Sequence, residues 1–129
     1  MTTAPISVRL PAPIAEQVRQ IAAIEHRSLA ETVRRLTEEA LVLRAFPDVV
    51  FTDGPTGRRA TLIAGPDVWE VIEPYLLAGK DWEALRASYP QLDESLLRTA
   101  IRYYEAFPAE IEARIARNTA DLPTDLGGP

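Results

Sequence analysis

The chain has 129 residues, of which 47% are hydrophobic and 26% are charged, a composition typical of a folded globular protein. It has no cysteine, which excludes disulfides and zinc fingers, and no apolar run approaches the roughly 18 residues of a membrane span. The net charge of −5 is uneven, because residues 1–37 carry five Arg against three Glu, whereas residues 38–129 carry nine Lys or Arg against sixteen Asp or Glu. The N-terminus lacks the pattern of a secretory signal, so we expect a cytoplasmic protein without membrane association.

The first predicted element is a short β-strand over residues 6–10, where apolar and polar residues alternate. A lone strand leaves backbone groups unpaired on both edges, so we expect two chains to pair these strands in an antiparallel ribbon. The inner, dimerising face would carry Ile6, Val8 and Leu10. The outer face would present Ser7 and Arg9 twice, on a ribbon of the size that enters the DNA major groove.

Two helices are predicted after the strand. From Pro13 to about residue 25, apolar residues recur with helical spacing, and proline suits the first turn of a helix. Ser28 and Glu31 have the Ser-x-x-Glu spacing of a capping box, which predicts a second helix that ends near residue 46, before Pro47. A strand and two helices cannot enclose a core alone, so we expect residues 1–46 to form a homodimer.

A β-hairpin is predicted to begin the second module, which spans residues 47–120. Two β-prone runs, residues 49–52 and 60–64, flank a stretch dense in turn formers at 53–57. Together with the helices that follow, this hairpin places the chain in the class of mainly α proteins with short β elements.

Helices are predicted for the rest of this module. Three aspartates precede helical patterns and are predicted helix caps: Asp67, Asp81 and Asp93. The last helix should begin at Pro108. Residues 121–129 have little to bury and are expected to be a disordered tail.

The first module resembles the ribbon-helix-helix (MetJ/Arc/CopG-like) superfamily of bacterial repressors and antitoxins. The resemblance covers about a third of the chain: I-S-V-R-L-P, an amphipathic helix, the turn and cap H-R-S-L-A-E-T-V-R-R-L, and a second helix. It implies that outward strand side chains read bases, here Ser7 and Arg9. It also implies that amides at the start of the second helix hold a DNA phosphate, here at Ser28 and Leu29. A further outward position, often polar in this superfamily, is Pro5, which cannot donate a hydrogen bond.

The second module resembles a bacterial helical family catalogued as domain of unknown function 433, over roughly residues 59–117. The matching runs are I-A-G-P-D-V-W-E-V-I, A-G-K-D-W-E-A-L, S-Y-P-Q-L-D-E, A-I-R-Y-Y and A-E-I. The resemblance implies association with antitoxins of the VapB type, beside nuclease toxins of a PIN-like fold, and helices that look like a helix-turn-helix. The Thr-Arg pair that usually follows I-A-G in this family is absent here.

A helix-turn-helix over residues 81–105 would point five side chains toward DNA: Glu94, Ser95, Arg98, Thr99 and Arg102. The adjacent Asp93 and Glu94 would repel phosphate there. The charge of residues 47–129 is −6, from eight Lys or Arg against fourteen Asp or Glu. We therefore predict that this module binds a protein partner.

The sequence has few residues that could support catalysis. His26 is the only histidine, so neither a Ser-His-Asp triad nor a multi-histidine metal site can form, and it is predicted to be a turn residue. No G-x-G-x-x-G or phosphate-loop motif occurs. We expect no enzyme activity, no cofactor and no metal. Arg34 and Arg35 are expected either to approach the DNA backbone or to be solvated helix charges.

The sequence thus predicts a DNA-binding transcriptional repressor that is the antitoxin of a toxin-antitoxin pair. Residues 1–46 would bind double-stranded operator DNA as a dimer, and residues 47–120 would bind a PIN-like nuclease toxin. The alternative is a ribbon-helix-helix regulator without a toxin, whose second module forms higher homo-oligomers or senses a ligand. A third reading is a dimerising scaffold that does not bind DNA.

Overall fold

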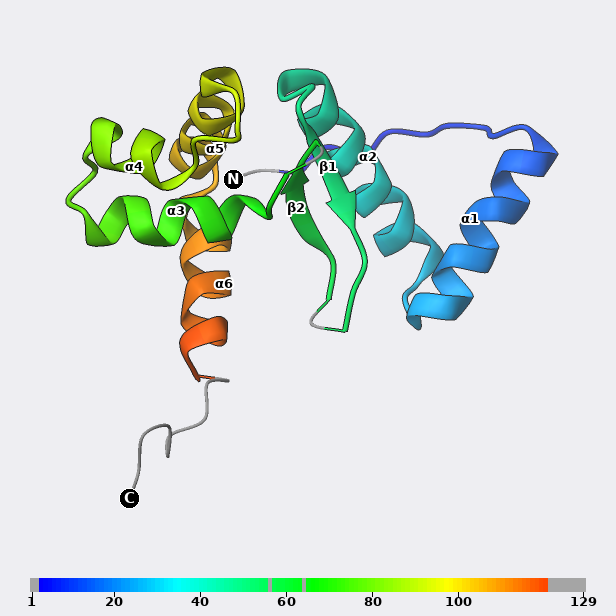
Figure 1. Ribbon diagram of the computed structural model, residues 1–129. Helices are drawn as coiled ribbons and strands as arrows, with labels where there is room; N and C mark the ends of the chain where they lie inside the picture. The colour runs from blue at the N-terminus through cyan, green and yellow to red at the C-terminus, as the bar shows by residue number, and fades with distance from the viewer. Residues whose placement is uncertain (1–2, 56, 64, 121–129) are drawn as a thin grey trace. The chain divides into compact units, whose positions relative to one another are not determined.

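The fold is mainly helical, with one small sheet (Figure 1). The computed structural model describes residues 3–55, 57–63 and 65–120, and over these residues the chain forms six helices and one two-stranded antiparallel sheet. This confirms the predicted class of mainly α with short β. The predicted disordered tail, residues 121–129, lies outside the described residues.

The chain divides into two compact units, Met1–Val42 and Leu43–Pro129, here called unit 1 and unit 2. The division falls inside the second helix, before the predicted boundary at residue 46. Each unit is described by itself below.

Unit 1 contains an N-terminal segment, helix α1 (Ala12–Glu25) and most of helix α2 (Leu29–Ala45). Both helices occur where the apolar spacing predicts them. Helix α1 ends at His26, which adopts the left-handed conformation with φ of 55° and whose backbone N–H donates to the last turn. This confirms that His26 is a turn residue.

The strand predicted over residues 6–10 requires a second chain to pair with, so a single chain leaves that prediction untested. Residues 3–11 form neither helix nor strand, and Figure 1 draws them as an extended trace before α1. A strand exists only when its backbone groups bond to a neighbouring strand. Within the described part of one chain, the paired strands are Val49–Thr52 and Arg59–Leu62, and residues 6–10 pair with neither.

The hairpin of unit 2 pairs β1 (Val49–Thr52) with β2 (Arg59–Leu62), with Val49 opposite Leu62. Its inner face is buried through Val49, Ala60 and Leu62, whereas Val50 on the other face is 40% exposed. This alternation is typical of a sheet with one face against a core and the other toward water.

The four helices of unit 2 are α3 (Val68–Leu77), α4 (Trp82–Ser88), α5 (Glu94–Ala106) and α6 (Pro108–Ala120). Helix α3 contacts the other three helices and β2, and it runs through the middle of the unit (Figure 1). Its residues Val68, Val71 and Ile72 are fully buried. The core of unit 2 is therefore built around α3.

The three predicted aspartate caps behave differently. Asp81 accepts hydrogen bonds from the backbone N–H groups of Glu83 at 3.0 Å and Ala84 at 3.2 Å, as expected of a cap. Asp93 occupies the N-cap position of α5, but its side chain accepts no capping hydrogen bond. Asp67 is the N-cap residue of α3, where its backbone N–H donates to the Glu70 carboxylate at 3.2 Å, and its own carboxylate also binds side chains of other elements.

Pro74 lies inside α3, where its missing N–H leaves the Glu70 carbonyl without its helical donor. The Tyr89 hydroxyl donates to that carbonyl at 2.9 Å. Burial, followed by the negative charges of Glu70 and Glu73, raises the pKa of the Tyr89 hydroxyl. A side chain from beyond α4 thus supplies the hydrogen bond that proline removes.

Candidate nucleic-acid interface

The two side chains predicted to read bases, Ser7 and Arg9, are exposed on the N-terminal segment of unit 1. The apolar residues that alternate with them are exposed as well: Ile6 by 83%, Val8 by 69% and Leu10 by 41%. This short segment has no core of its own. Its apolar side chains therefore stay exposed unless another surface covers them.

Exposed apolar side chains continue onto both helices of unit 1. We call this group the unit 1 apolar set: Ile6, Val8, Leu10, Ile14, Ile24, Leu29, Val33 and Leu41. Among the described residues of the unit, only Val18 and Ala22 are buried apolar residues. Isolated exposed apolar residues are ordinary, but here most of the large apolar side chains of the unit face solvent in the single chain.

The start of α2 is the predicted phosphate site, and it is exposed from Ser28 through Leu29. The Ser28 hydroxyl accepts from the Glu31 backbone N–H at 3.1 Å, which confirms half of the predicted capping box. The Glu31 carboxylate instead accepts from Arg34. The first amides of a helix have no partner within the helix, and a capped, exposed helix start can bind an anion.

Thr32 was not singled out by the sequence, yet it anchors this helix start. It is fully buried, and its hydroxyl donates to the Ser28 carbonyl at 2.9 Å. The spacing of four residues between the cap and this threonine is visible in the sequence and permits the hydrogen bond. The burial of the threonine depends on how α1 and α2 pack, which the spacing does not predict.

Arg35 is not a solvated helix charge. Its side chain is 17% exposed and lies between the carboxylates of Glu25 and Glu39, the latter at 2.9 Å. Of these two ion pairs, only Arg35–Glu39 can be predicted from the sequence, because its residues lie four apart on one helix. The Glu25 contact joins α2 to α1, so it depends on the turn between them.

Arg34 is a solvated helix charge, with a side chain that is 64% exposed. It contacts Glu31 and, at 4.0 Å, Glu38. The hydrogen bond that Arg34 donates to Glu31 and the charges of both carboxylates raise the pKa of Arg34 above its ordinary value. Unit 1 carries five Arg and five Glu over residues 1–42, so its positive and negative charges are equal in number. Arg9 is the only cationic side chain on the N-terminal segment.

The helix-turn-helix alternative in unit 2 loses one of its five residues, because Thr99 is 3% exposed and its hydroxyl donates to the Asp48 carboxylate at 3.3 Å. The Arg98 guanidinium lies 4.2 Å from the centre of the Trp82 ring, and Arg102 lies 5.6 Å from that of Phe46. Both arginines are nevertheless exposed, so packing within unit 2 removes only Thr99 from the predicted row.

The part of the chain that the structure describes contains neither a metal-binding cluster nor a membrane-spanning helix. Within residues 3–55, 57–63 and 65–120, no three His, Cys, Asp or Glu side chains gather in a way that could hold a metal ion. No described helix is both long and apolar enough to cross a bilayer.

Comparison with known proteins gives no assignment, because no family model, no curated protein and no solved structure matches the chain.

Proposed function

We propose that this protein is a DNA-binding transcriptional repressor of the ribbon-helix-helix type, with unit 1 as its dimeric DNA-binding part. Two N-terminal segments would pair antiparallel over residues 6–10. The paired segments would form the two-stranded ribbon that a single chain lacks.

The observation that carries this proposal is the unit 1 apolar set. Eight large apolar side chains are exposed in a unit with two buried apolar residues. Pairing of two segments would cover Ile6, Val8 and Leu10 against helices of both chains, because successive side chains of a strand point to opposite faces. The same pairing would leave Ser7 and Arg9 on the outer face, where a guanidinium can donate two hydrogen bonds to guanine.

The exposed start of α2 supports a contact with the DNA backbone. Amides at the beginning of α2, beside the Ser28 cap, would donate to a phosphate on each side of the ribbon. Such contacts fix the position of a protein on the duplex and contribute affinity for any sequence.

The antitoxin role is a further part of the proposal. Residues 43–129 carry nine Lys or Arg against fourteen Asp or Glu, a charge of −5. This charge suits a basic protein partner better than DNA. Together with the resemblance of residues 59–117 to an antitoxin-associated family, it supports a nuclease toxin as the partner of unit 2.

Selection of duplexes from a random library with the full chain tests the DNA-binding part. We expect enrichment of a two-fold symmetric site, because a symmetric dimer places its two ribbon strands on related half-sites. Failure to enrich any duplex at low salt would contradict the proposal. The toxin part is tested separately by co-purification from the native operon, in which the product of an adjoining gene should accompany the chain.

A further inference from the structure

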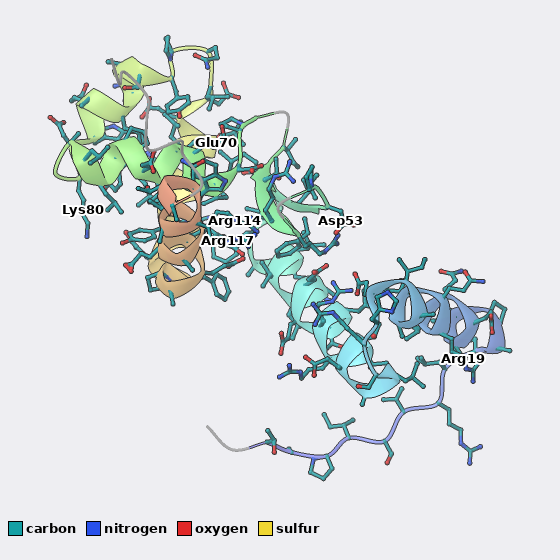
Figure 2. The ribbon with its side chains drawn as sticks, turned by 90° about the horizontal axis from the view of Figure 1, so that it is seen from below. Arg19, Asp53, Glu70, Lys80, Arg114 and Arg117 are labelled. Atoms are coloured by element: carbon teal, nitrogen blue, oxygen red, sulfur yellow. The ribbon has the colours of Figure 1, made fainter. Side chains whose placement is uncertain are left out.

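An arginine-lined cavity lies in unit 2, and all the residues that line it belong to that unit. Its volume is about 190 Å³. The hairpin contributes Arg58 and Arg59 to its lining, α6 contributes Arg114 and Arg117, and Trp69 of α3 and Glu110 of α6 complete its polar and aromatic walls. Figure 2 labels Arg114 and Arg117, which lie close together on α6.

The charge of this cavity is opposite to that of its surroundings. Unit 2 has nine Lys or Arg and fourteen Asp or Glu, yet four of the nine cations line this one cavity. Glu110 is the one carboxylate among the described residues that line it, and its side chain already accepts from the Tyr103 hydroxyl at 2.8 Å. A concentration of guanidinium groups in an acidic unit favours an anionic ligand.

One wall of the cavity is held in place by the Asp67 carboxylate, which is 7% exposed. This carboxylate accepts hydrogen bonds from three side chains: Arg59, Thr61 at 2.9 Å and Trp69 at 3.2 Å. Asp67 therefore fixes both Arg59 and the indole of Trp69 at the cavity. The one N–H of the indole donates to Asp67, so the donors that remain for a ligand on this wall are the other guanidinium N–H groups of Arg59, which lose little conformational freedom when a ligand binds.

The opposite wall comes from α6. The Arg114 guanidinium donates to the Arg58 carbonyl at 3.1 Å and so ties this helix to the hairpin. The Arg58 guanidinium lies 3.0 Å from Asp53, whose side chain is 75% exposed. Exposed ion pairs of this kind contribute little free energy, so a bound anion can replace Asp53 at Arg58.

We propose that this cavity binds a phosphate group. The planar guanidinium donates paired hydrogen bonds that match phosphate oxygens, and four such groups from two elements surround one small space. The phosphate belongs either to a small phosphorylated molecule or to the backbone of DNA. The first source would make unit 2 a ligand sensor, and the second would extend DNA contact beyond unit 1. The assignment is independent of the repressor function, which depends on unit 1.

Isothermal titration of the full chain with inorganic phosphate, pyrophosphate and a short duplex of random sequence tests the assignment. Arg117→Gln removes an exposed cavity cation, and Arg58→Gln removes one from the hairpin. The matched control is Lys80→Gln, which makes the same charge change at an exposed residue that does not line the cavity. Melting temperatures of all three variants establish that each is folded.

We expect wild type and Lys80→Gln to bind at least one of the three probes equally, and both arginine variants to bind it at least about tenfold more weakly. If pyrophosphate or phosphate shows this pattern, the source is a small molecule. If only the duplex shows it, the source is the DNA backbone. Absence of binding to all three probes, binding that the arginine variants leave unchanged, or equal weakening by Lys80→Gln would overturn the assignment.

Discussion

Units 1 and 2 differ in how much apolar surface each buries within one chain. Among the described residues, unit 1 has two buried apolar residues and eight large exposed ones, whereas unit 2 has eleven buried and four large exposed ones. Because apolar burial is the dominant favourable contribution to folding, unit 2 gains more from its own core than unit 1 does. Unit 1 has little core of its own, and we expect a second chain to complete it. We therefore expect unit 1 to assemble the protein and unit 2 to bind another partner.

The largest effect is expected from Val8→Asp. This change places two carboxylates in the inner layer of the proposed ribbon, where their burial without partners costs several kcal/mol. Sedimentation should show loss of the dimer, and operator binding should be lost with it. The control is Leu77→Asp, at an apolar side chain of unit 2 that is 83% exposed. A dimer that survives Val8→Asp, or that is lost equally with Leu77→Asp, would contradict the assignment of assembly to unit 1.

A cavity in the core of unit 2 is expected to have the next largest effect. Ile72 is fully buried on α3, so Ile72→Ala should lower the free energy of unfolding by about 2–5 kcal/mol, measured by urea denaturation. Ile63→Ala, at a side chain that is 45% exposed, should lose only a fraction of this. Neither variant should change the association state. Equal losses in the two variants would mean that unit 2 lacks the compact core described here.

Arg9→Ala should have a smaller effect, confined to DNA. Removal of a bidentate contact to guanine costs about 1–3 kcal/mol on the selected operator and little on random duplex, measured by fluorescence anisotropy. Arg19→Ala is the matched control, because Arg19 lies on α1 with a side chain that is 61% exposed, 3.6 Å from Glu16. Equal losses on both duplexes would show that Arg9 contacts only phosphate.

The smallest effect is expected at Tyr89. Tyr89→Phe leaves the Glu70 carbonyl without the hydroxyl donor, at a cost of about 1 kcal/mol. Because the pKa of Tyr89 is raised in the folded chain, its contribution is present below the ordinary tyrosine pKa of about 10 and is lost as the pH rises through the folded value. As the pH rises through the folded pKa, the free energy of unfolding, measured by urea denaturation, should therefore fall less for Tyr89→Phe than for wild type.

Tyr104→Phe is the comparison for the pH dependence. Burial and the hydrogen bond to Glu112 raise the pKa of Tyr104 as well, but this hydroxyl satisfies no helix carbonyl. Identical stability of the Tyr89→Phe variant and wild type at neutral pH would contradict the role assigned to Tyr89 beside Pro74.

Local signals in the sequence were enough to predict the helices and the hairpin. Apolar periodicity located α1 and α2, the Ser28 cap marked the helix start that the structure has, and turn formers separated β1 from β2. These signals depend on residues within a few positions of each other, where side-chain geometry follows from backbone periodicity.

Features that join distant residues were not predictable. Arg58 and Arg114 are far apart in sequence but meet at one cavity, and Asp67 was predicted only as a helix cap although its carboxylate holds Arg59 and Trp69. Phe46 was placed at the end of the first module, yet its ring lies 5.3 Å from that of Tyr103 in the core of unit 2. Such contacts are decided by tertiary packing, which cannot be predicted from the spacing of residues along the chain.

The most direct test compares the association state of the full chain with that of a fragment beginning at Leu43. The fragment keeps Phe46, whose ring also lies 6.2 Å from that of Phe107, so the core of unit 2 stays complete. Sedimentation velocity should give a dimer for the full chain and a folded monomer for the fragment. A monomeric full chain at micromolar concentration, or a dimeric fragment, would contradict the claim that unit 1 assembles the protein.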